Sequence, residues 1–357
     1  MRNIVALGAE SKSSFSVISR KGFYYDSLGG NLREVENFKV FENRLRKYIN
    51  DNRIPVDCIV CDTHPDYFST RLAEKLLWEN KKAQLLKVQH HFAHAVSCMF
   101  DNDIDEEVCA VIFDGTGFGS DGNWWGSELL ICDRKNYRRV KSLEYIHQPG
   151  ADIAAKESWR MALAYLLKAY GNDFNKLNPP LFDRIGNKKI SFTRQMIEKD
   201  INCPLTSSMG RLFDAVSSII GLCDVCGFEA EAAILLEKEA VENINDCYGY
   251  EITENKISVL PMIRQIVEDL SGGMKTGVIS AKFHNTIGEI VFETVRGISN
   301  VSGIKKIVVS GGCFQNNYLM NYIEKRFLDS GLELFKHNKY STTDLGVSVG
   351  QAVIATM

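Results

Sequence analysis

The spacing of apolar and polar positions predicts two similar series of strands, one in each half of the chain. Three short strands are predicted first, over residues 3–7, 15–19 and 23–26. The same order returns after residue 105, with strands predicted over 108–113, 125–132 and 140–145. A polar break at Gly8-Ala9-Glu10 ends the first strand of the first series, and Asp114-Gly115-Thr116-Gly117 ends that of the second. The two series share an architecture but not their residues.

Alternating helices and strands are predicted to follow each series. In the first half these are helices over 35–49 and 67–78 and strands over 58–61 and 84–88. In the second half they are strands over 305–309 and 332–335, a helix over 317–328 and a last helix from about Asp344. Residues 150–300 between them are mostly helical in pattern, with a polar break over 172–180.

Two βββαβα units in tandem indicate an α/β protein with the duplicated actin/hexokinase-like (ASKHA) fold. We expect an N-terminal lobe over 1–104 and a C-terminal lobe over 105–357, with a helical insertion in the second lobe at about 150–300. In this fold the cleft between the lobes holds a nucleotide. The alternative from the pattern is a doubly wound sheet with a helical insert.

Composition narrows the class of protein. The 357 residues carry a formal net charge of −3, which provides no overall field to attract nucleic acid or an anionic membrane, so we expect no duplex nucleic acid as partner. No apolar run approaches the roughly 18 residues that span a bilayer, and the run over 4–9 stops at Glu10, which is unlike a signal peptide. Ten cysteines without a dense framework predict reduced thiols and a cytoplasmic location.

Two Cys-x-x-Cys pairs bear on metal binding. Cys58 and Cys61 lie three apart in a predicted strand, where they point to opposite faces and cannot easily share an ion. Cys223 and Cys226 precede Gly227 in a predicted loop, where a zinc site stays open as an alternative. No second pair of ligands lies nearby in the sequence, so a structural zinc is not favoured.

His90 and His94 form the strongest metal-binding pattern. They follow the strand over 84–88 and lie four apart at the start of a predicted helix, so both imidazoles share one face. His91 points about 100° away from that face. The alternative is a polar helix start with solvated histidines, but four of the seven histidines lie between residues 64 and 94. Two imidazoles with oxygen ligands suit iron(II), zinc or manganese.

Glycine-rich turns predict contacts to phosphate. Asp114-Gly115-Thr116-Gly117-Phe118-Gly119 lies at the end of one apolar strand, where backbone amides can approach an anion. Ser310-Gly311-Gly312 lies at the end of another, just before a predicted helix N-terminus. The recurrence favours nucleotide contact over simple chain punctuation.

Two aspartates remain ambiguous from the residues alone. Asp214, four residues after Gly210, lies near the start of a helix, where it could hold ribose hydroxyls or only stabilise the helix N-terminus, and the second interpretation is favoured. Asp344 begins the last helix, either as its N-cap or as a ligand that ties the second lobe to the histidine pair. Glu229 and Glu231 are equally ambiguous.

Several of these motifs together resemble a known family. The motifs are Gln89-His90-His91-Phe92-Ala93-His94, Asp114-Gly115-Thr116-Gly117, Ser207-Ser208-Met209-Gly210-Arg211-Leu212-Phe213-Asp214-Ala215, Ser310-Gly311-Gly312-Cys313-Phe314-Gln315-Asn316, and Cys61-Asp62-Thr63-His64-Pro65-Asp66-Tyr67 with Ser69-Thr70-Arg71. In order and spacing, from Met1 to the end, they look like the C-terminal half of HypF, the carbamoyltransferase of [NiFe]-hydrogenase maturation. Its relatives include threonylcarbamoyl-transferring tRNA-modification proteins and antibiotic O-carbamoyltransferases.

This resemblance implies roles for individual residues. It implies a metal, commonly iron with zinc as the alternative, held by His90, His94, Asp114 and Asp344. It implies a nucleotide, ATP or AMP as carbamoyl adenylate, contacted by Asp114, Gly115, Thr116, Gly117, Phe118, Lys156, Arg160, Gly210, Asp214, Gly311, Gly312 and Asn316. Glu10, Lys12 and His91 would adjoin the reacting groups, and which of them acts as a general base stays open.

The implied reaction transfers a carbamoyl group from carbamoyl adenylate, with AMP as leaving group. In HypF the acceptor is the C-terminal cysteine of a partner maturation protein (HypE-like). The acylphosphatase, zinc-finger and YrdC-like domains of HypF do not occur in this sequence. We therefore expect a separate YrdC-like protein to supply the adenylate, an excised domain, or a different acceptor. Alternatives are O-carbamoylation of a small molecule, ATP phosphotransfer as in sugar kinases of the same fold, and a non-catalytic nucleotide-binding protein.

Overall fold

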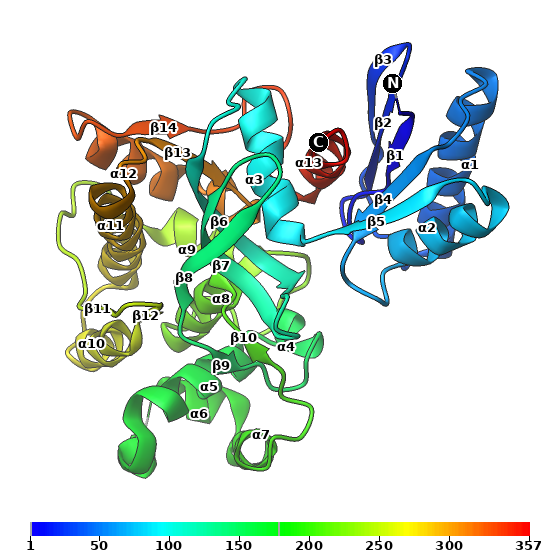
Figure 1. The fold of residues 1–357 in the computed structure, drawn as a ribbon. Helices are drawn as coiled ribbons and strands as arrows, with labels where there is room; N and C mark the ends of the chain where they lie inside the picture. The colour runs from blue at the N-terminus through cyan, green and yellow to red at the C-terminus, as the bar shows by residue number, and fades with distance from the viewer. Residues whose placement is uncertain (1, 178) are drawn as a thin grey trace.

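The computed structural model describes residues 2–177 and 179–357, and these residues form two mixed sheets (Figure 1). The first sheet has the order β3-β2-β1-β4-β5. Its strands are β1 (Ile4–Ala6), β2 (Ser14–Ser19), β3 (Gly22–Ser27), β4 (Cys58–Asp62) and β5 (Gln84–Val88). The first three strands pair antiparallel, whereas β4 and β5 run parallel to β1.

The second sheet repeats this topology. Its central order is β8-β7-β6-β13-β14, again with an antiparallel triplet followed by two parallel strands. Its main strands are β6 (Val108–Phe118), β7 (Trp124–Cys132), β8 (Tyr137–Leu143), β13 (Lys306–Ser310) and β14 (Glu333–Phe335). The duplicated actin-like fold predicted from the repeated pattern is therefore confirmed.

Two helices cover one face of the first sheet. α1 (Val35–Asp51) and α2 (Phe68–Glu79) bury apolar residues at helical spacing, such as Phe41 with Leu45 and Leu72 with Leu76. Cys61 of β4 packs in this core, whereas Cys58 packs in the core on the other face of the sheet. The expectation that the two thiols point to opposite faces is confirmed.

The other face of the first sheet is joined to the second sheet by two helices. α3 (His90–Asp101) packs on β6, β7 and β13, and α13 (Val347–Ile354) packs on α3 and on β1, β2 and β4 (Figure 1). The two helices approach closely because Gly350 has no side chain: a Cβ atom there would lie 1.9 Å from the Ala93 carbonyl oxygen. Since α3 precedes residue 104 but packs on the second sheet, the division into lobes at that position stays a prediction.

The segment between β8 and β13 is mostly helical, as the pattern over 150–300 predicts. Its helices are α4 (Ile153–Lys156), α5 (Trp159–Tyr170), η1 (Gly171–Lys176), α6 (Pro180–Ile185), α7 (Asn187–Glu198), α8 (Met209–Ile219), α9 (Glu231–Glu239), α10 (Leu260–Ser271) and α11 (Thr276–Ser302). The remaining helical elements are η2 (Gly312–Gln315), α12 (Asn317–Phe327) and η3 (Asp344–Gly346). The polar break predicted over 172–180 begins inside η1, and Asn178 within it lies outside the described residues.

Some local predictions are wrong. The predicted break at Asp114-Gly115-Thr116-Gly117 is part of β6, which continues to Phe118 through a register shift between Phe113 and Gly117. The short strands β9 (Ile146–His147), β10 (Leu205–Thr206), β11 (Glu251–Ile252) and β12 (Lys256–Ser258) were not predicted, because two or three residues carry no readable alternation. Among the described residues, no helix is long and apolar enough to cross a membrane.

Candidate metal and nucleotide site

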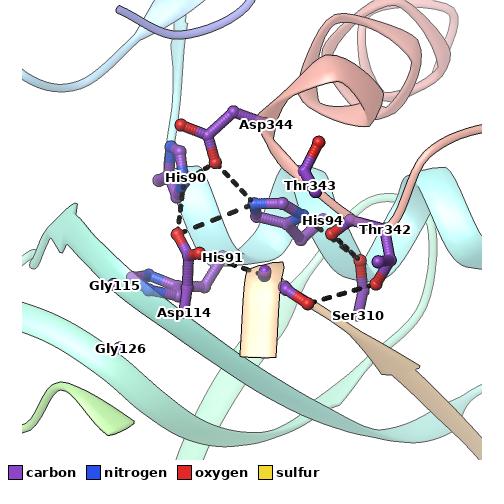
Figure 2. Close-up of polar contacts among 12 residues, drawn as sticks. His90, His91, His94, Asp114, Gly115, Gly126, Ser310, Thr342, Thr343 and Asp344 are labelled. Carbon is purple, nitrogen blue, oxygen red and sulfur yellow. Dashed lines mark hydrogen bonds and ion pairs between the residues drawn. The ribbon is translucent and has the colours of Figure 1, made fainter. Parts of the chain in front are cut away.

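Four side chains from three distant parts of the chain converge between the two sheets (Figure 2). His90 and His94 come from α3, Asp114 from β6 and Asp344 from η3, and one potential ligand atom of each lies within 4.8 Å of all the others. His90 Nε2 lies 3.4 Å from Asp114 Oδ2 and 3.6 Å from Asp344 Oδ1. His94 Nε2 lies 4.0 Å and 3.5 Å from the same two oxygens.

The start of α3 places the two histidines. The Gln89 side chain caps the helix by accepting the Phe92 backbone N–H at 2.8 Å, which fixes where the helix begins. His90 and His94 then lie one turn apart, with both side chains fully buried. The predicted pairing of the two imidazoles on one helical face is therefore what the structure contains.

Each of the four side chains is oriented by a second contact. Asp62 Oδ2 lies 2.7 Å from His90 Nδ1, and Ser310 Oγ lies 3.2 Å from His94 Nδ1. Asp114 Oδ1 accepts the Gly312 backbone N–H at 3.1 Å, and Asp344 Oδ2 accepts the Ser11 hydroxyl at 3.1 Å. These contacts leave His90 Nε2 and His94 Nε2 facing the two carboxylates.

The electrostatics of this cluster fit a cation. Within residues 2–177 and 179–357, neither His90 Nε2 nor His94 Nε2 has a hydrogen-bond partner, although both atoms are buried. Burial lowers the pKa of His90, but the carboxylates of Asp62, Asp114 and Asp344 raise it well above its usual value. Three carboxylates around two imidazoles leave a net negative charge in a largely buried place, which is costly unless a cation is bound. The donor set of two imidazoles and two carboxylates suits iron(II), zinc or manganese.

The two facing aspartates remain ionised. Burial and the charge of Asp344 raise the pKa of Asp114, but His90 and His94 lower it by a larger amount, so that its pKa is about 2. Burial likewise raises the pKa of Asp344, and the two imidazoles bring it well below its usual value. Both carboxylates are therefore available as anionic oxygen donors at neutral pH.

His91 has a different environment from its two neighbours. Its Nδ1 accepts a hydrogen bond from the Gln89 side-chain amide at 3.0 Å, and its ring lies against Gly117, where a Cβ atom would come within 2.4 Å of it. Burial, followed by the charge of His90, lowers the pKa of His91 well below its usual value. His91 is therefore a neutral imidazole beside the cluster, with its Nε2–H buried.

The predicted glycine turns lie close to Asp114. Gly311 has φ +102°, and a Cβ atom there would lie 2.3 Å from the Phe113 carbonyl oxygen, so only glycine fits. Gly210 lies against Gly115, where a Cβ atom would come within 2.9 Å of the Gly115 Cα. The Ser208 hydroxyl, which caps α8, donates toward the Asp114 and Gly115 carbonyl oxygens at 3.1 and 2.6 Å. The structure thus brings the turns predicted to contact phosphate to one place.

Two of the predicted nucleotide contacts are already engaged by protein groups. Asp214 on α8 is buried and lies 2.8 Å from Arg211; burial raises its pKa to about 6 although Arg211 lowers it. Asn316 caps α12 by accepting the Leu319 N–H and donates to His284 Nε2 at 2.9 Å. Burial lowers the pKa of His284 to about 4, so this imidazole is a neutral acceptor.

A cavity of about 240 Å³ lies beside the cluster. Ser11, which contacts Asp344, lines it together with Thr116, Gly117 and Phe118, which follow Asp114 along β6. Glu10 also lines it: one carboxylate oxygen accepts the Phe68 N–H at the start of α2 at 2.7 Å, and the other, which is buried, lies 3.4 Å from Arg33 Nε in an ion pair. Burial raises the pKa of Glu10.

The remaining predicted residues lie around this region rather than in the cavity. Lys12 forms an ion pair with Glu229, which links the first sheet's β1–β2 loop to the helical segment. Arg160 donates to Glu157 at 2.5 Å and lies over the Trp159 ring, and neither it nor Lys156 lines the cavity. The structure does not bring these last two residues to the cluster.

The second Cys-x-x-Cys pair lies apart from this cluster. Cys223 and Cys226 are buried, with their sulfur atoms 3.8 Å apart. Among the described residues, the four side chains of the cluster are the only group with the spacing of a metal site. The alternative of a structural zinc on this pair therefore has no further ligands to support it.

Sequence reasoning missed the residues that orient the histidines. Asp62 and Ser310 are part of the quoted motifs, but no role was assigned to either. A positional signal exists: each is the last residue of a buried parallel strand, next to the first strand of its sheet. Polar residues at such strand ends are frequent in functional sites of open α/β sheets.

Comparison with known proteins gives consistent matches along the chain. Residues 1–101 match the family described as "HypF Kae1-like domain", and residues 110–351 match "Carbamoyltransferase, Kae1-like Domain, second subdomain". A relative from Methanocaldococcus jannaschii named "Probable carbamoyltransferase HypF" is 34% identical over 99% of this chain and 46% of its own length. A "Carbamoyltransferase HypF homolog" from Cupriavidus necator is 28% identical over 99% of this chain and 91% of its own length.

A solved structure agrees with these matches. The crystal structure of full-length HypF "in the phosphate- and nucleotide-bound form" superposes with a TM-score of 0.91 at 34% identity, covering 99% of this chain and 55% of that one. The chain thus spans about half the length of that HypF and of the Methanocaldococcus relative.

Proposed function

The chain belongs to the HypF carbamoyltransferase family, and from its site we propose that it transfers a carbamoyl group from carbamoyl adenylate to an acceptor thiol. The observation that carries this proposal is the convergence of His90, His94, Asp114 and Asp344 beside the glycines within β6 and the glycines that follow β13. A sugar kinase of the same fold needs magnesium, which prefers oxygen ligands and retained water. Two buried imidazoles favour a transfer reaction with a softer metal over phosphotransfer.

The four side chains of the cluster would hold one divalent ion, iron or zinc. When bound, such an ion supplies Lewis-acid polarisation of phosphate and carbamoyl oxygens. Asp62 and Ser310 would keep the two imidazoles turned so that each Nε2 lone pair faces that ion. The low pKa of Asp114 keeps its carboxylate charged at neutral pH.

The residues around the cluster would position the donor. The backbone at Gly115, Thr116, Gly117 and Phe118 and at Gly311 and Gly312 would approach the adenylate phosphate, because the glycines among them carry no side chain that would hold an anion away from the backbone amides. Gly210, Asp214 and Asn316 would line the side that takes the nucleoside. Lys156 and Arg160 remain the weakest part of the proposed contact set, since neither lines the cavity.

Transfer needs a base for the acceptor. The acceptor sulfur would form a bond to the carbamoyl carbon while the bond from that carbon to the phosphate oxygen breaks, and AMP leaves with the electron pair. The thiol proton would pass to Glu10, whose Oε1 atom is buried at the cavity beside Arg33. Lys12 and His91 flank the same region, and His91 is held neutral by burial.

The proposed partners follow from the same chemistry. The acceptor would be a protein with a C-terminal cysteine, and a separate YrdC-like protein would form the adenylate. All ten cysteines of the chain are free thiols, which supports the proposed reducing, cytoplasmic location. A small-molecule hydroxyl acceptor is the alternative to this protein thiol.

Synthetic carbamoyl adenylate tests the proposal directly. Incubation of the metal-loaded chain with a peptide ending in cysteine should give AMP and a thiocarbamate on that peptide. A matched peptide ending in serine should not be modified. AMP release without carbamoylation of either peptide would count against transfer to a protein thiol. A second reaction with ATP and sugars distinguishes phosphotransfer, for which we expect no ADP.

Metal analysis tests the site itself. His90→Ala and His94→Ala should each lose stoichiometric iron or zinc, because each substitution removes one of four proposed ligands. His147→Ala, at a half-exposed histidine outside the cluster, is the matched control. Retention of the ion by both cluster variants would show that the metal assignment is wrong.

A further inference from the structure

A chain of buried polar groups leads from His94 away from the cluster. His94 Nδ1 lies 3.2 Å from Ser310 Oγ, and Ser310 Oγ lies 2.9 Å from His337 Nε2 (Figure 2 shows the first contact). His337 Nδ1 lies 3.4 Å from Asp101 Oδ2. The side chains of His337 and Asp101 are 4% and 2% exposed, so water does not replace these contacts.

The order of donors and acceptors along this chain follows from its two ends. At one end, His94 must keep a lone pair on Nε2 to bind an ion, so its proton is on Nδ1 and is donated to Ser310. At the other end, the Asp101 carboxylate lies at the longer distance of 3.4 Å from His337 Nδ1, where its charge favours a proton on Nδ1 and leaves His337 Nε2 as an acceptor. The Ser310 hydroxyl then donates to His337 while it accepts from His94. Every member of the chain has one consistent role.

Asp101 is well suited to end this chain. It is the last residue of α3, the helix that carries His94, and it accepts the backbone N–H groups of Asn338, Lys339 and Tyr340 at 2.7 to 3.1 Å. Burial raises the pKa of Asp101, but His337 and these N–H groups lower it further, to about 2. The same carboxylate therefore anchors the loop that leads to Asp344, another member of the cluster.

We propose that Ser310, His337 and Asp101 form a relay that fixes the tautomer and orientation of His94 for metal binding. These three are positioning residues, since none of them has an atom in the cluster. The relay deepens the proposed function, because it rests on the cluster holding an ion. Outer contacts of this kind change metal affinity about 10- to 100-fold in proteins.

Two serine-to-alanine substitutions give a matched test. Ser310→Ala removes the hydroxyl that His94 contacts. Ser97→Ala removes a hydroxyl that is also fully buried, on α3 itself, and that has no hydrogen-bond partner in the described parts of the chain. Zn²⁺ affinity is measured by competition with a chelator, alongside the melting temperature of the metal-free chain. We expect Ser310→Ala to bind Zn²⁺ about tenfold more weakly and Ser97→Ala to bind it like the parent.

The second link has its own variant. His337→Leu removes the acceptor of the Ser310 hydroxyl, but that hydroxyl can turn to the Thr342 carbonyl oxygen, 3.5 Å away. We therefore expect about a threefold loss of Zn²⁺ affinity, and no further loss when His337→Leu is added to Ser310→Ala, because both act through one path.

The outcomes separate this inference from the proposed function. Equal Zn²⁺ affinity of Ser310→Ala and Ser97→Ala, or fully additive losses in the double variant, would overturn the relay. A parent chain that binds no Zn²⁺ would instead overturn the metal site on which the proposed function depends. Should Ser310→Ala not fold, His337→Leu against Ser97→Ala carries the same test, and equal affinity there overturns the relay.

Discussion

The ends of two equivalent strands, β4 in the first sheet and β13 in the second, support the two histidines in different ways. Each strand has five residues and runs parallel to the first strand of its sheet. The last residue of β4, Asp62, contacts His90 directly, and the last residue of β13, Ser310, contacts His94. The duplicated fold thus supplies one outer contact from each sheet.

The difference lies in how each contact reaches a carboxylate. At β4 the carboxylate is the strand's own residue, 2.7 Å from the imidazole. At β13 a hydroxyl and a second imidazole separate His94 from the carboxylate of Asp101. Charge-assisted hydrogen bonds are about twice as strong as neutral ones, so the contact of Asp62 with His90 should be stronger than that of Ser310 with His94. This ranking and the roles of the residues around the cluster can be tested by substitution.

The largest effect is expected at Asp62. Asp62→Asn replaces an acceptor-only group with an amide that can donate to His90 Nδ1 and so favour the wrong tautomer. We expect Zn²⁺ to bind about 100-fold more weakly, which corresponds to about 2.7 kcal/mol. Asp66→Asn, at an exposed aspartate four residues on, is the control and should bind normally. An effect at Asp62 smaller than at Ser310 would reverse the proposed ranking.

Asp101, at the far end of the path from His94, should affect folding stability. The pKa of Asp101 is about 2 in the folded chain, below its unfolded value of about 3.9, so its ionised form stabilises the fold. This stability is present above pH 4 and is lost as pH falls from 4 toward 2. Asp101→Asn should therefore reduce the free energy of unfolding of the metal-free chain by about 2 kcal/mol at pH 7.

Denaturant unfolding between pH 7 and pH 3 measures this effect. The difference between the parent and Asp101→Asn should shrink as the pH decreases. Asp103→Asn, at an exposed aspartate two residues on, should unfold like the parent throughout. A constant difference at all pH values would mean that Asp101 acts by packing rather than by its charge.

A third contrast concerns the acidic residue near the end of the first strand of each sheet. After β1 the acidic residue is Glu10, at the cavity, whereas within β6 it is Asp114, in the cluster. Glu10→Gln should lower carbamoyl transfer about tenfold or more and leave Zn²⁺ affinity unchanged. Burial raises the pKa of Glu10, and only its deprotonated form can act as a base. The transfer rate of the parent should therefore rise with pH from 4.5 upward through this pKa.

Rates measured across that pH range check the assignment. The rate of Glu10→Gln should not show this rise with pH, whereas the rate of Glu36→Gln, at an exposed glutamate of α1, should still show it. If the rate of Glu10→Gln rose with pH as the parent's does, another group would be the proton acceptor.

Local patterns predicted the fold and the histidine pair well. The repeated order of strands and helices predicted the duplicated sheets, and i, i+4 spacing predicted that His90 and His94 share a face. Both signals depend on neighbouring residues, which the sequence presents directly. The run of β6 through its glycines was missed because a bulge preserves pairing where composition indicates a break.

Contacts between distant residues could not be predicted from pattern. The residues alone left Asp344 open as a cap or a ligand, and the resemblance to a family was needed to join Asp114 and Asp344 to the histidines in one set, since each has an ordinary interpretation as a turn or cap residue. Ser310, His337 and Asp101 come from a strand end, a loop and a helix end, and only the packing of α3 against the second sheet brings them together. A buried hydroxyl has no sequence signature that distinguishes it from a core serine.

The smallest effect is expected at the ion pair between Lys12 and Glu229, which lies outside the cluster. Lys12 and Glu229 are 34% and 66% exposed, so solvent screens the ion pair. Burial lowers the pKa of Lys12, but the neighbouring Glu229 raises it by more, so the net change is upward. A double-mutant cycle with Lys12→Ala and Glu229→Ala should give a coupling below about 1 kcal/mol, and 1 M salt should remove most of it. A coupling of several kcal/mol would mean that this surface ion pair is a main connection between the first sheet and the helical segment. A small one places the connection between the two sheets in the buried packing of α3 and α13.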